Sequence, residues 1–187
     1  MNKQWIEAQS HEKHHGQNAD VSRRNYEVFQ YLAITAEDVA DRTILEIGGG
    51  NFPVCGNLPM FRRAVNVDPL WVAYHDKLQR DDVEIIPLPF EQYEAPSIFD
   101  EAWIFNVLQH VVDPRMILRK AKSCAKVLRV FEPINWPTDK LHLHVLTEAM
   151  FHEEFPQAEI KIYKGGTTRH FHESDCIYFS TSQEPKS

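Results

Sequence analysis

The stretch Ile44-Leu-Glu-Ile-Gly-Gly-Gly50 decides the fold of this chain. Together with Thr43 it begins as a short run of branched apolar residues, which is typical of a buried β-strand, and it then breaks at three glycines. Residues without a Cβ let the backbone of a turn come close to a ligand. Because ligands of open parallel sheets lie beyond the carboxyl ends of the strands, this turn is a candidate ligand-binding loop.

An acidic residue follows at the end of the next strand. Asp68 closes the run Ala64-Val-Asn-Val-Asp68, 18 residues beyond Gly50. An acid in this place can accept hydrogen bonds from both hydroxyls of a ribose, which favours a nucleoside-containing ligand. A tight turn beside a solvated loop carboxylate is the alternative interpretation. A dinucleotide is disfavoured, because Pro53 stands where the G-x-G-x-x-G fingerprint has its third glycine.

Strand and helix patterns alternate along the chain around this turn. The alternation predicts a parallel sheet covered on both faces, and the two last strands predict a hairpin. We therefore expect an α/β three-layer sandwich with a mostly parallel seven-stranded sheet and a C-terminal antiparallel hairpin, in a strand order that the sequence leaves open. The expected strands are 43–47, 64–68, 83–86, 99–105, 126–131, 159–163 and 176–180, and the expected helices are 22–34, one opened by Asp113 and Pro114, and 147–155.

The length of 187 residues suits one domain with one sizeable core. Within it we expect an N-terminal helical segment, a cofactor-binding half and an acceptor-side half, over residues 1–40, 41–135 and 136–187 respectively.

The composition narrows the class of partner and the compartment. The chain carries 20 Lys and Arg against 27 Asp and Glu, a formal charge of −7, and this balance disfavours nucleic acid as a partner. The three cysteines, Cys55, Cys124 and Cys176, are far apart and form no C-x-x-C pair, so we expect a reducing, cytoplasmic location. No signal peptide or membrane span is predicted. The oligomeric state stays open.

Four residues after the fourth and fifth strands are candidates for acid–base chemistry. His110 follows the fourth strand, and its imidazole suits a general base near neutral pH, although a structural histidine is the alternative. Glu132 follows the fifth strand. His142 and His144 are two residues apart, so in an extended chain their rings point to the same side and can face a substrate.

The same H-x-H spacing would also suit a metal, and His170 and His172 repeat it. We nevertheless expect no metal, because no acid-and-histidine spacing in the chain is a known ligand set.

Taken together, several stretches between residues 44 and 155 resemble class I S-adenosylmethionine-dependent methyltransferases. Glu46-Ile-Gly-Gly-Gly50 is similar to their motif I, E-x-G-x-G, and Asp68 to the acid after their second strand. The remaining matches are Leu88-Pro-Phe-Glu91, Phe99-Asp100 and Asn106-Val-Leu-Gln-His-Val-Val-Asp-Pro114. The resemblance implies a Rossmann-like fold and S-adenosylmethionine as the cofactor. One departure is Phe52, which stands where a third motif glycine is common.

The resemblance also implies roles for individual residues. Asp68 would bind the ribose hydroxyls, Glu46 would hold the turn or the amino group of the ligand, and Asn106 would lie beside the methionine portion. The remaining residues implied at the cofactor are Gly48, Gly49, Gly50 and Pro69 around the turn, and Phe90 and Glu91 near the adenine.

The function that we expect is methyl transfer to oxygen or nitrogen of a small-molecule acceptor. Asn106-Val-Leu stands where a nucleobase amino-methylating enzyme would have a D-P-P-Y-like segment. Two alternatives stay open: a degenerate methyltransferase fold that acts as a binding or partner module, and a nucleotide-dependent oxidoreductase on a similar fold.

Overall fold

The seven expected strands form one sheet in the order β3-β2-β1-β4-β5-β7-β6. The computed structural model describes residues 3–18, 28–29, 32–50, 53–70, 80–165 and 174–182. The strands are β1 Thr43–Ile47, β2 Arg63–Val67, β3 Val83–Ile86, β4 Phe99–Phe105, β5 Ala125–Pro133, β6 Lys161–Tyr163 and β7 Cys176–Ser182, and the helices are α1 Lys3–Asn18, α3 Pro114–Cys124 and α4 Glu148–Glu154, with short 3-10 turns η1 Val54–Asn57, η3 Phe90–Gln92 and η4 Leu108–His110.

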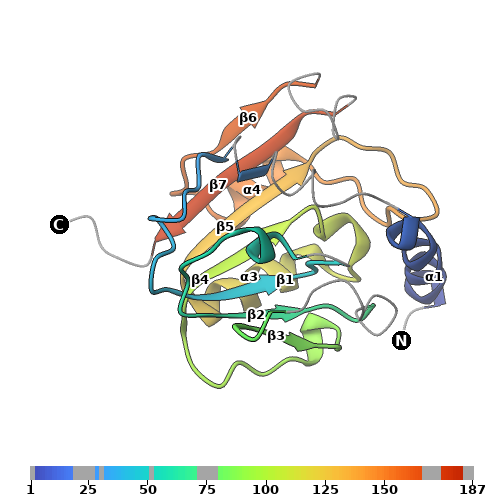
Figure 1. Cartoon of the computed structure of the whole chain (residues 1–187). Coiled ribbons are helices and arrows are strands. Elements are labelled where there is room, and N and C mark those ends of the chain that lie inside the picture. Colours follow the sequence, from blue (N-terminus) through green and yellow to red (C-terminus); the bar gives the residue numbers. More distant parts are fainter. Residues whose placement is uncertain are drawn as a thin grey trace.

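The first five strands run parallel, and β7 pairs antiparallel with both β5 and β6. The expected C-terminal antiparallel hairpin is confirmed, and the structure adds that β7 lies between β5 and β6 (Figure 1). The predicted strand boundaries hold to within a few residues. The helix expected over 22–34 lies largely outside the described residues, and α1 lies inside the segment 1–40 that we expected to be helical.

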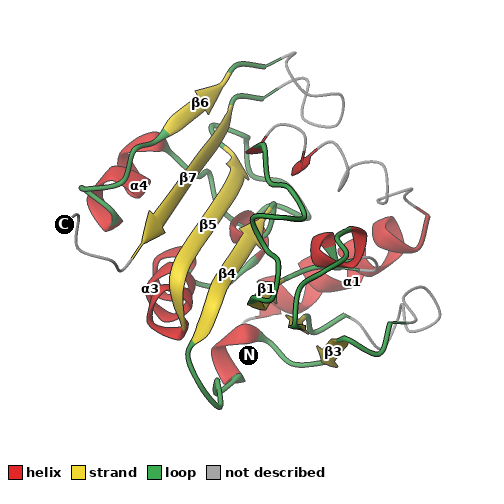
Figure 2. Cartoon of the chain, turned by 60° about the vertical axis from the view of Figure 1, so that its left-hand side comes forward, coloured by secondary structure: helices red, strands yellow, loops and turns green. Residues whose placement is uncertain are grey.

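Alternating residues of the strands fill two apolar layers, one on each face of the sheet. Leu45 and Ile47 of β1 point to the layer that contains Ile117 of α3 and Phe151 of α4. Ile44 points to the opposite layer, where Trp103 is fully buried. Figure 2 shows α3 and α4 together on one side of β4, β5 and β7. Burial on both faces explains why these strands are nearly continuous apolar runs.

Helix α3 begins as the sequence predicts. The Asp113 carboxylate accepts the backbone N–H of Met116 at 3.0 Å, and Pro114 occupies the first turn. Arg115 and Arg119 of α3 then bind Glu154 of α4, with N–O distances of 2.8 and 2.7 Å. These contacts fix the two helices to each other on one face of the sheet.

One buried carboxylate interrupts the apolar layer around Trp103. Glu101 has no exposed surface, and its oxygens accept hydrogen bonds from Arg129 at 2.7 and 3.1 Å, from Arg42 at 3.1 Å and from the Trp103 indole at 2.7 Å. A buried charge is tolerated when it is paired and hydrogen-bonded in this way. The cluster therefore ties β1, β4 and β5 together near their amino ends.

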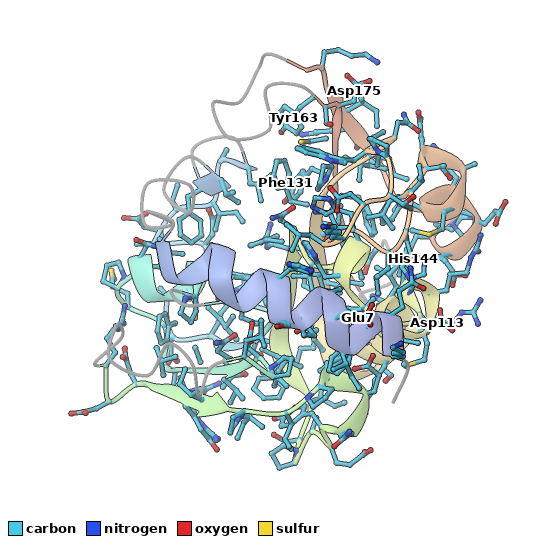
Figure 3. All side chains as sticks on the ribbon, turned by 90° about the vertical axis from the view of Figure 1, so that its right-hand side faces the viewer. Glu7, Asp113, Phe131, His144, Tyr163 and Asp175 are labelled. Carbon is cyan, nitrogen blue, oxygen red and sulfur yellow. The ribbon has the colours of Figure 1, made fainter. Side chains whose placement is uncertain are left out.

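Helix α1 lies near the carboxyl ends of the strands. It contacts η4, which follows β4, and Gln9 Nε2 lies 3.5 Å from the carbonyl oxygen of His110. Figure 3, which looks at the right-hand side of Figure 1, shows α1 running across the front of the molecule over the ends of the strands. In the part of the chain that the structure describes, no helix has the length and apolar character needed to cross a bilayer.

Candidate cofactor and acceptor site

The glycine turn after β1 has a backbone that only glycine adopts readily. Gly48 and Gly50 have φ angles of +70° and +64°, in the left-handed region. A Cβ on Gly48 would lie 2.6 Å from Cγ1 of Val107, so the turn packs directly against the segment after β4. A Cβ on Gly50, by contrast, would meet no atom of the described residues within 4 Å. The turn is therefore tight at its beginning and open at Gly50, where a ligand could approach the backbone.

Two polar side chains accept hydrogen bonds from the backbone of the glycine turn and of η1, which follows it. The Asn66 Oδ1 accepts the backbone N–H of Gly49 at 3.1 Å, and a Cβ on Gly49 would lie 2.5 Å from the same oxygen. The Glu46 carboxylate accepts the N–H groups of Val54 and Cys55 at 2.6 and 2.7 Å, which fixes η1 against β1. These bonds hold the segment that follows the glycine turn, and both roles implied for Glu46 at the cofactor stay predictions. Asn66 was not predicted as part of the site.

Asp68 joins the glycine turn to the loop after β2. Its Oδ2 accepts the N–H of Gly50 at 2.8 Å, and its Oδ1 accepts the N–H of Leu70 at 2.7 Å. The residue is only 5% exposed, so it is not the solvated loop carboxylate of the alternative interpretation. Pro69 follows it and is half-buried. A carboxylate has about four acceptor sites, so Asp68 can accept further hydrogen bonds from a ligand.

The segment after β4 contributes Asn106, and Glu132 of β5 supports this segment. Asn106 has a φ of +62°, its N–H donates to the Phe131 carbonyl at 2.8 Å, and its Oδ1 accepts from Gln109 Nε2 at 2.9 Å. Glu132 of β5 has no exposed surface, and its Oε1 accepts the N–H groups of Val107 and Leu108 at 2.8 and 3.1 Å. Burial raises the pKa of Glu132 to about 8, although the two N–H donors oppose the shift. Glu132 therefore supports the turn from inside the core.

Phe90 and Glu91 lie in η3, next to β3. The Phe90 side chain is buried in the apolar layer, with Lys120 Nζ 5.5 Å from its ring centre, whereas Glu91 is partly exposed. The same Lys120 Nζ donates to the Glu91 carbonyl at 2.9 Å. The Phe90 side chain is therefore part of the core, and the role of both residues at the adenine stays a prediction.

The loop of residues 134–146, between β5 and α4, folds back onto η4. Leu143 N donates to the Gln109 carbonyl at 2.7 Å, and His144 Nε2 donates to the Val111 carbonyl at 2.9 Å. His110 Nδ1 donates to the Leu141 carbonyl at 3.0 Å. The structure thus brings His110 and His144 together at one place in the fold, and it uses a nitrogen of each ring to attach the loop to η4.

Three rings form a row along this loop. The centre of the His142 ring lies 5.0 Å from that of His110 and 5.3 Å from that of Trp136. His142 Nδ1 lies 2.9 Å from Oδ2 of Asp139, which sequence reasoning missed. Its spacing of three residues before His142 is a local signal that could have revealed it, because an Asp side chain often binds backbone two or three residues further on.

Among the described residues, no group of three or more His, Cys, Asp or Glu side chains could hold a metal ion. Phe52, His170 and His172 lie outside the described residues. All three cysteines are buried and unpaired.

Comparisons with known proteins bear on the fold. No protein-family model and no curated protein sequence matches this chain. Solved structures do: an S-adenosylhomocysteine complex of DhpI has a TM-score of 0.71 and 13% identity, covering 99% of this chain and 100% of that one. The N-methyltransferase NodS from Bradyrhizobium japonicum WM9, also with S-adenosylhomocysteine, has a TM-score of 0.66 and 16% identity, covering 89% and 90%.

A cyclase, SpnF, is similar as well, with a TM-score of 0.65 and 12% identity over 84% of this chain and 78% of that one. At such identities the similarity concerns the fold and not the activity. The order of the strands, the antiparallel β7 and these similarities agree that the chain has the Rossmann-like fold of class I S-adenosylmethionine-dependent methyltransferases.

Proposed function

We propose that this protein is an S-adenosylmethionine-dependent methyltransferase that acts on oxygen or nitrogen of a small-molecule acceptor. The observation that carries the proposal is the open backbone at Gly50 beside the buried carboxylate of Asp68. These two groups come from neighbouring parallel strands and meet at the carboxyl edge, where nucleoside ligands of such sheets bind. Two similar structures contain S-adenosylhomocysteine, the demethylated product of this cofactor, which supports the choice of ligand.

The proposal assigns a role to each residue at the cofactor. Asp68 would accept hydrogen bonds from the ribose hydroxyls, and the backbone of Gly48, Gly49 and Gly50 would lie against the nucleoside and methionine portion. Glu46 would act only through the turn that it holds. The further residues that we place at the cofactor are Pro69, Asn106, Glu91 and the backbone of Phe90.

The cofactor supplies a methyl group on a positively charged sulfur, which is already reactive. The protein therefore needs mainly to align the acceptor and, where the acceptor carries a proton, to remove it. Residues 136–187 would form the acceptor side and residues 41–135 the cofactor side of one domain. His110, His142 and His144 lie where the two meet, on η4 and the loop that covers it.

Burial assigns a different task to Glu132. Its side chain has no exposed surface and holds the N–H groups of Val107 and Leu108, so we propose that it positions the Asn106 turn rather than touching the acceptor. The net charge of −7 favours a small molecule over a nucleic acid as the acceptor. The unpaired thiols are compatible with the reducing cytoplasm.

Calorimetric titration with S-adenosylmethionine, S-adenosylhomocysteine and NADH tests the proposal. Binding of the first two without NADH is expected. Ligand at about 100 times its dissociation constant should stabilise the fold by about 2.7 kcal/mol, a melting shift of roughly 5–10 °C. An oxidoreductase would bind NADH instead. No response to either sulfur ligand at millimolar concentration would refute the methyltransferase proposal, and binding without transfer would favour a degenerate, non-catalytic domain.

A further inference from the structure

The position of the proton on His142 follows from its contacts. Oδ1 of Asp139 accepts the N–H groups of Leu141 and His142 at 2.7 and 2.8 Å, so this oxygen is occupied by the backbone. Oδ2 lies 2.9 Å from Nδ1 of His142. An ionised carboxylate can only accept, so Nδ1 must carry the hydrogen, and in the neutral ring Nε2 then has the lone pair.

No described residue hydrogen-bonds to Nε2 of His142, although the side chain is 13% exposed and lies in the row of rings. His144 differs, because its Nε2 donates to the Val111 carbonyl and the hydrogen of its neutral ring is therefore on Nε2. In both rings the lone pair is therefore on the nitrogen that has no described partner, Nε2 in His142 and Nδ1 in His144, but only in His142 does the protonated nitrogen face a carboxylate, which can stabilise the positive charge after proton uptake.

The ring of His142 is connected to the proposed cofactor side. Gln109 Nε2 donates to Oδ1 of Asn106 at 2.9 Å and lies 3.4 Å from Nε2 of His110, and the His110 ring is 5.0 Å from that of His142. On the other side of His142 lies Trp136, which is partly exposed. The His142 ring is tilted by 46° to the His110 ring and by 48° to the Trp136 ring, and aromatic side chains beside a nitrogen lone pair suit an aromatic acceptor that has an acidic proton.

We propose that the Asp139–His142 pair accepts the proton of a hydroxyl group on an aromatic acceptor, with Asp139 as the positioning residue. This inference rests on the proposed methyl transfer. The acceptor oxygen forms the bond to the methyl carbon, the carbon–sulfur bond breaks with its electron pair returning to sulfur, and the hydroxyl proton passes to Nε2 of His142. The Asp139 carboxylate stabilises the imidazolium that results, which later releases its proton to water.

Three variants separate this role from a purely structural turn. In Asp139→Asn the amide oxygen can still accept the backbone N–H groups, but the amide nitrogen faces His142 Nδ1 and reverses the tautomer. His142→Gln removes the base and leaves the Asp139 backbone contacts in place. Glu148→Gln is the matched control, because it changes a histidine–carboxylate pair with His152 on the exposed part of α4, 3.4 Å apart.

The first measurement is the tautomer, which nitrogen-15 NMR of the protein without ligand reports. We expect the hydrogen of neutral His142 on Nδ1 in the wild type and in Glu148→Gln, and on Nε2 in Asp139→Asn. A wild-type hydrogen on Nε2 would overturn the proposal. Calorimetry with S-adenosylhomocysteine, run separately, tests the proposed function, so a failure of cofactor binding is not confused with a failure of the pair.

The second measurement uses 4-nitrocatechol, whose visible absorption distinguishes the neutral from the ionised phenol. It is titrated into protein saturated with S-adenosylhomocysteine, about one pH unit below the pKa of the probe, where about a tenth of the free probe is ionised. We expect the wild type and Glu148→Gln to ionise most of the bound probe, and His142→Gln to leave the ionised fraction as it is in buffer. Asp139→Asn should give an intermediate ionised fraction without a change in the melting temperature. No ionisation by the wild type, or equal ionisation by His142→Gln, would overturn the proposal.

Discussion

Substitution of Asp68 by Asn tests the cofactor site most directly. The change keeps the size of the side chain but replaces one acceptor oxygen by an N–H₂ donor. In the structure one oxygen holds the N–H of Gly50 and the other holds that of Leu70, so one of the two backbone groups will face a donor. The charge that would attract the ribose hydroxyls is lost as well.

The size of the effect follows from these contacts. Hydrogen bonds to a charged group contribute about 1.5–3 kcal/mol, so S-adenosylhomocysteine should bind on the order of 10- to 100-fold more weakly. Loss of one backbone contact should lower the stability by about 1 kcal/mol, a melting decrease of roughly 2–4 °C. Calorimetry for the affinity and thermal unfolding for the stability separate the two terms.

Asp82→Asn is the matched control, because Asp82 lies at the opposite edge of the sheet, just before β3, and its carboxylate binds Arg80 at 2.6 Å. It should leave the affinity for S-adenosylhomocysteine unchanged. If Asp68→Asn binds within twofold of the wild type, Asp68 only holds the glycine turn and our assignment of the ribose site is wrong.

Four further variants test the turn and the segments that support it. Gly48→Ala should destabilise the fold and lower cofactor affinity, since its Cβ would lie 2.6 Å from Val107. Gly50→Ala should cost only about 1–2 kcal/mol of stability, from its left-handed backbone, and act mainly on affinity. If urea unfolding shows that both variants lose the same stability, the open space at Gly50 is contradicted. The pKa of Glu132 is raised from its ordinary value of 4.5 to about 8, so between these two pH values the native state keeps a proton that the unfolded chain has released. The protonated side chain therefore contributes to the free energy of unfolding fully below about pH 4.5, and this contribution is lost as the pH rises to about 8. Glu132→Gln should abolish that dependence, at most about 1.4 kcal/mol per pH unit, and an unchanged slope in urea unfolding across this range would refute the assignment. Asp113→Ala should lower the melting temperature by roughly 2–4 °C through loss of the helix cap and leave cofactor affinity unchanged, so a fall in affinity would show that α3 positions the site.

The parts of the fold that the sequence predicts have their causes close together in the chain. The strand and turn of residues 43–50 are a local apolar run followed by glycines, and the start of α3 is a local Asp-Pro cap. Such signals need no knowledge of distant contacts. The position of β7 between β5 and β6 depends on pairing between segments about 50 residues apart, and no local pattern contains that information.

The same distinction applies to the site. Gly48, Gly50 and Asp68 could be predicted, because the requirement for each arises at the end of its own strand. Asn66 is an unusual residue for a buried strand, but the sequence does not say which group its amide binds, and only the three-dimensional structure brings that amide to Gly49.

Glu132 shows why a residue type and a position at the sheet edge are insufficient to assign a catalytic role. The sequence places its carboxylate after the fifth strand, where it could face an acceptor. The strand extends to Pro133, however, so Glu132 belongs to β5, and the alternation of side chains directs it into the same layer as Leu128 and Val130. There its only described partners are two backbone N–H groups of the next turn. The observed strand ends two residues later than the predicted end at residue 131, and this places Glu132 inside the sheet. His142 lies on a loop outside the sheet and is the better candidate for direct chemistry.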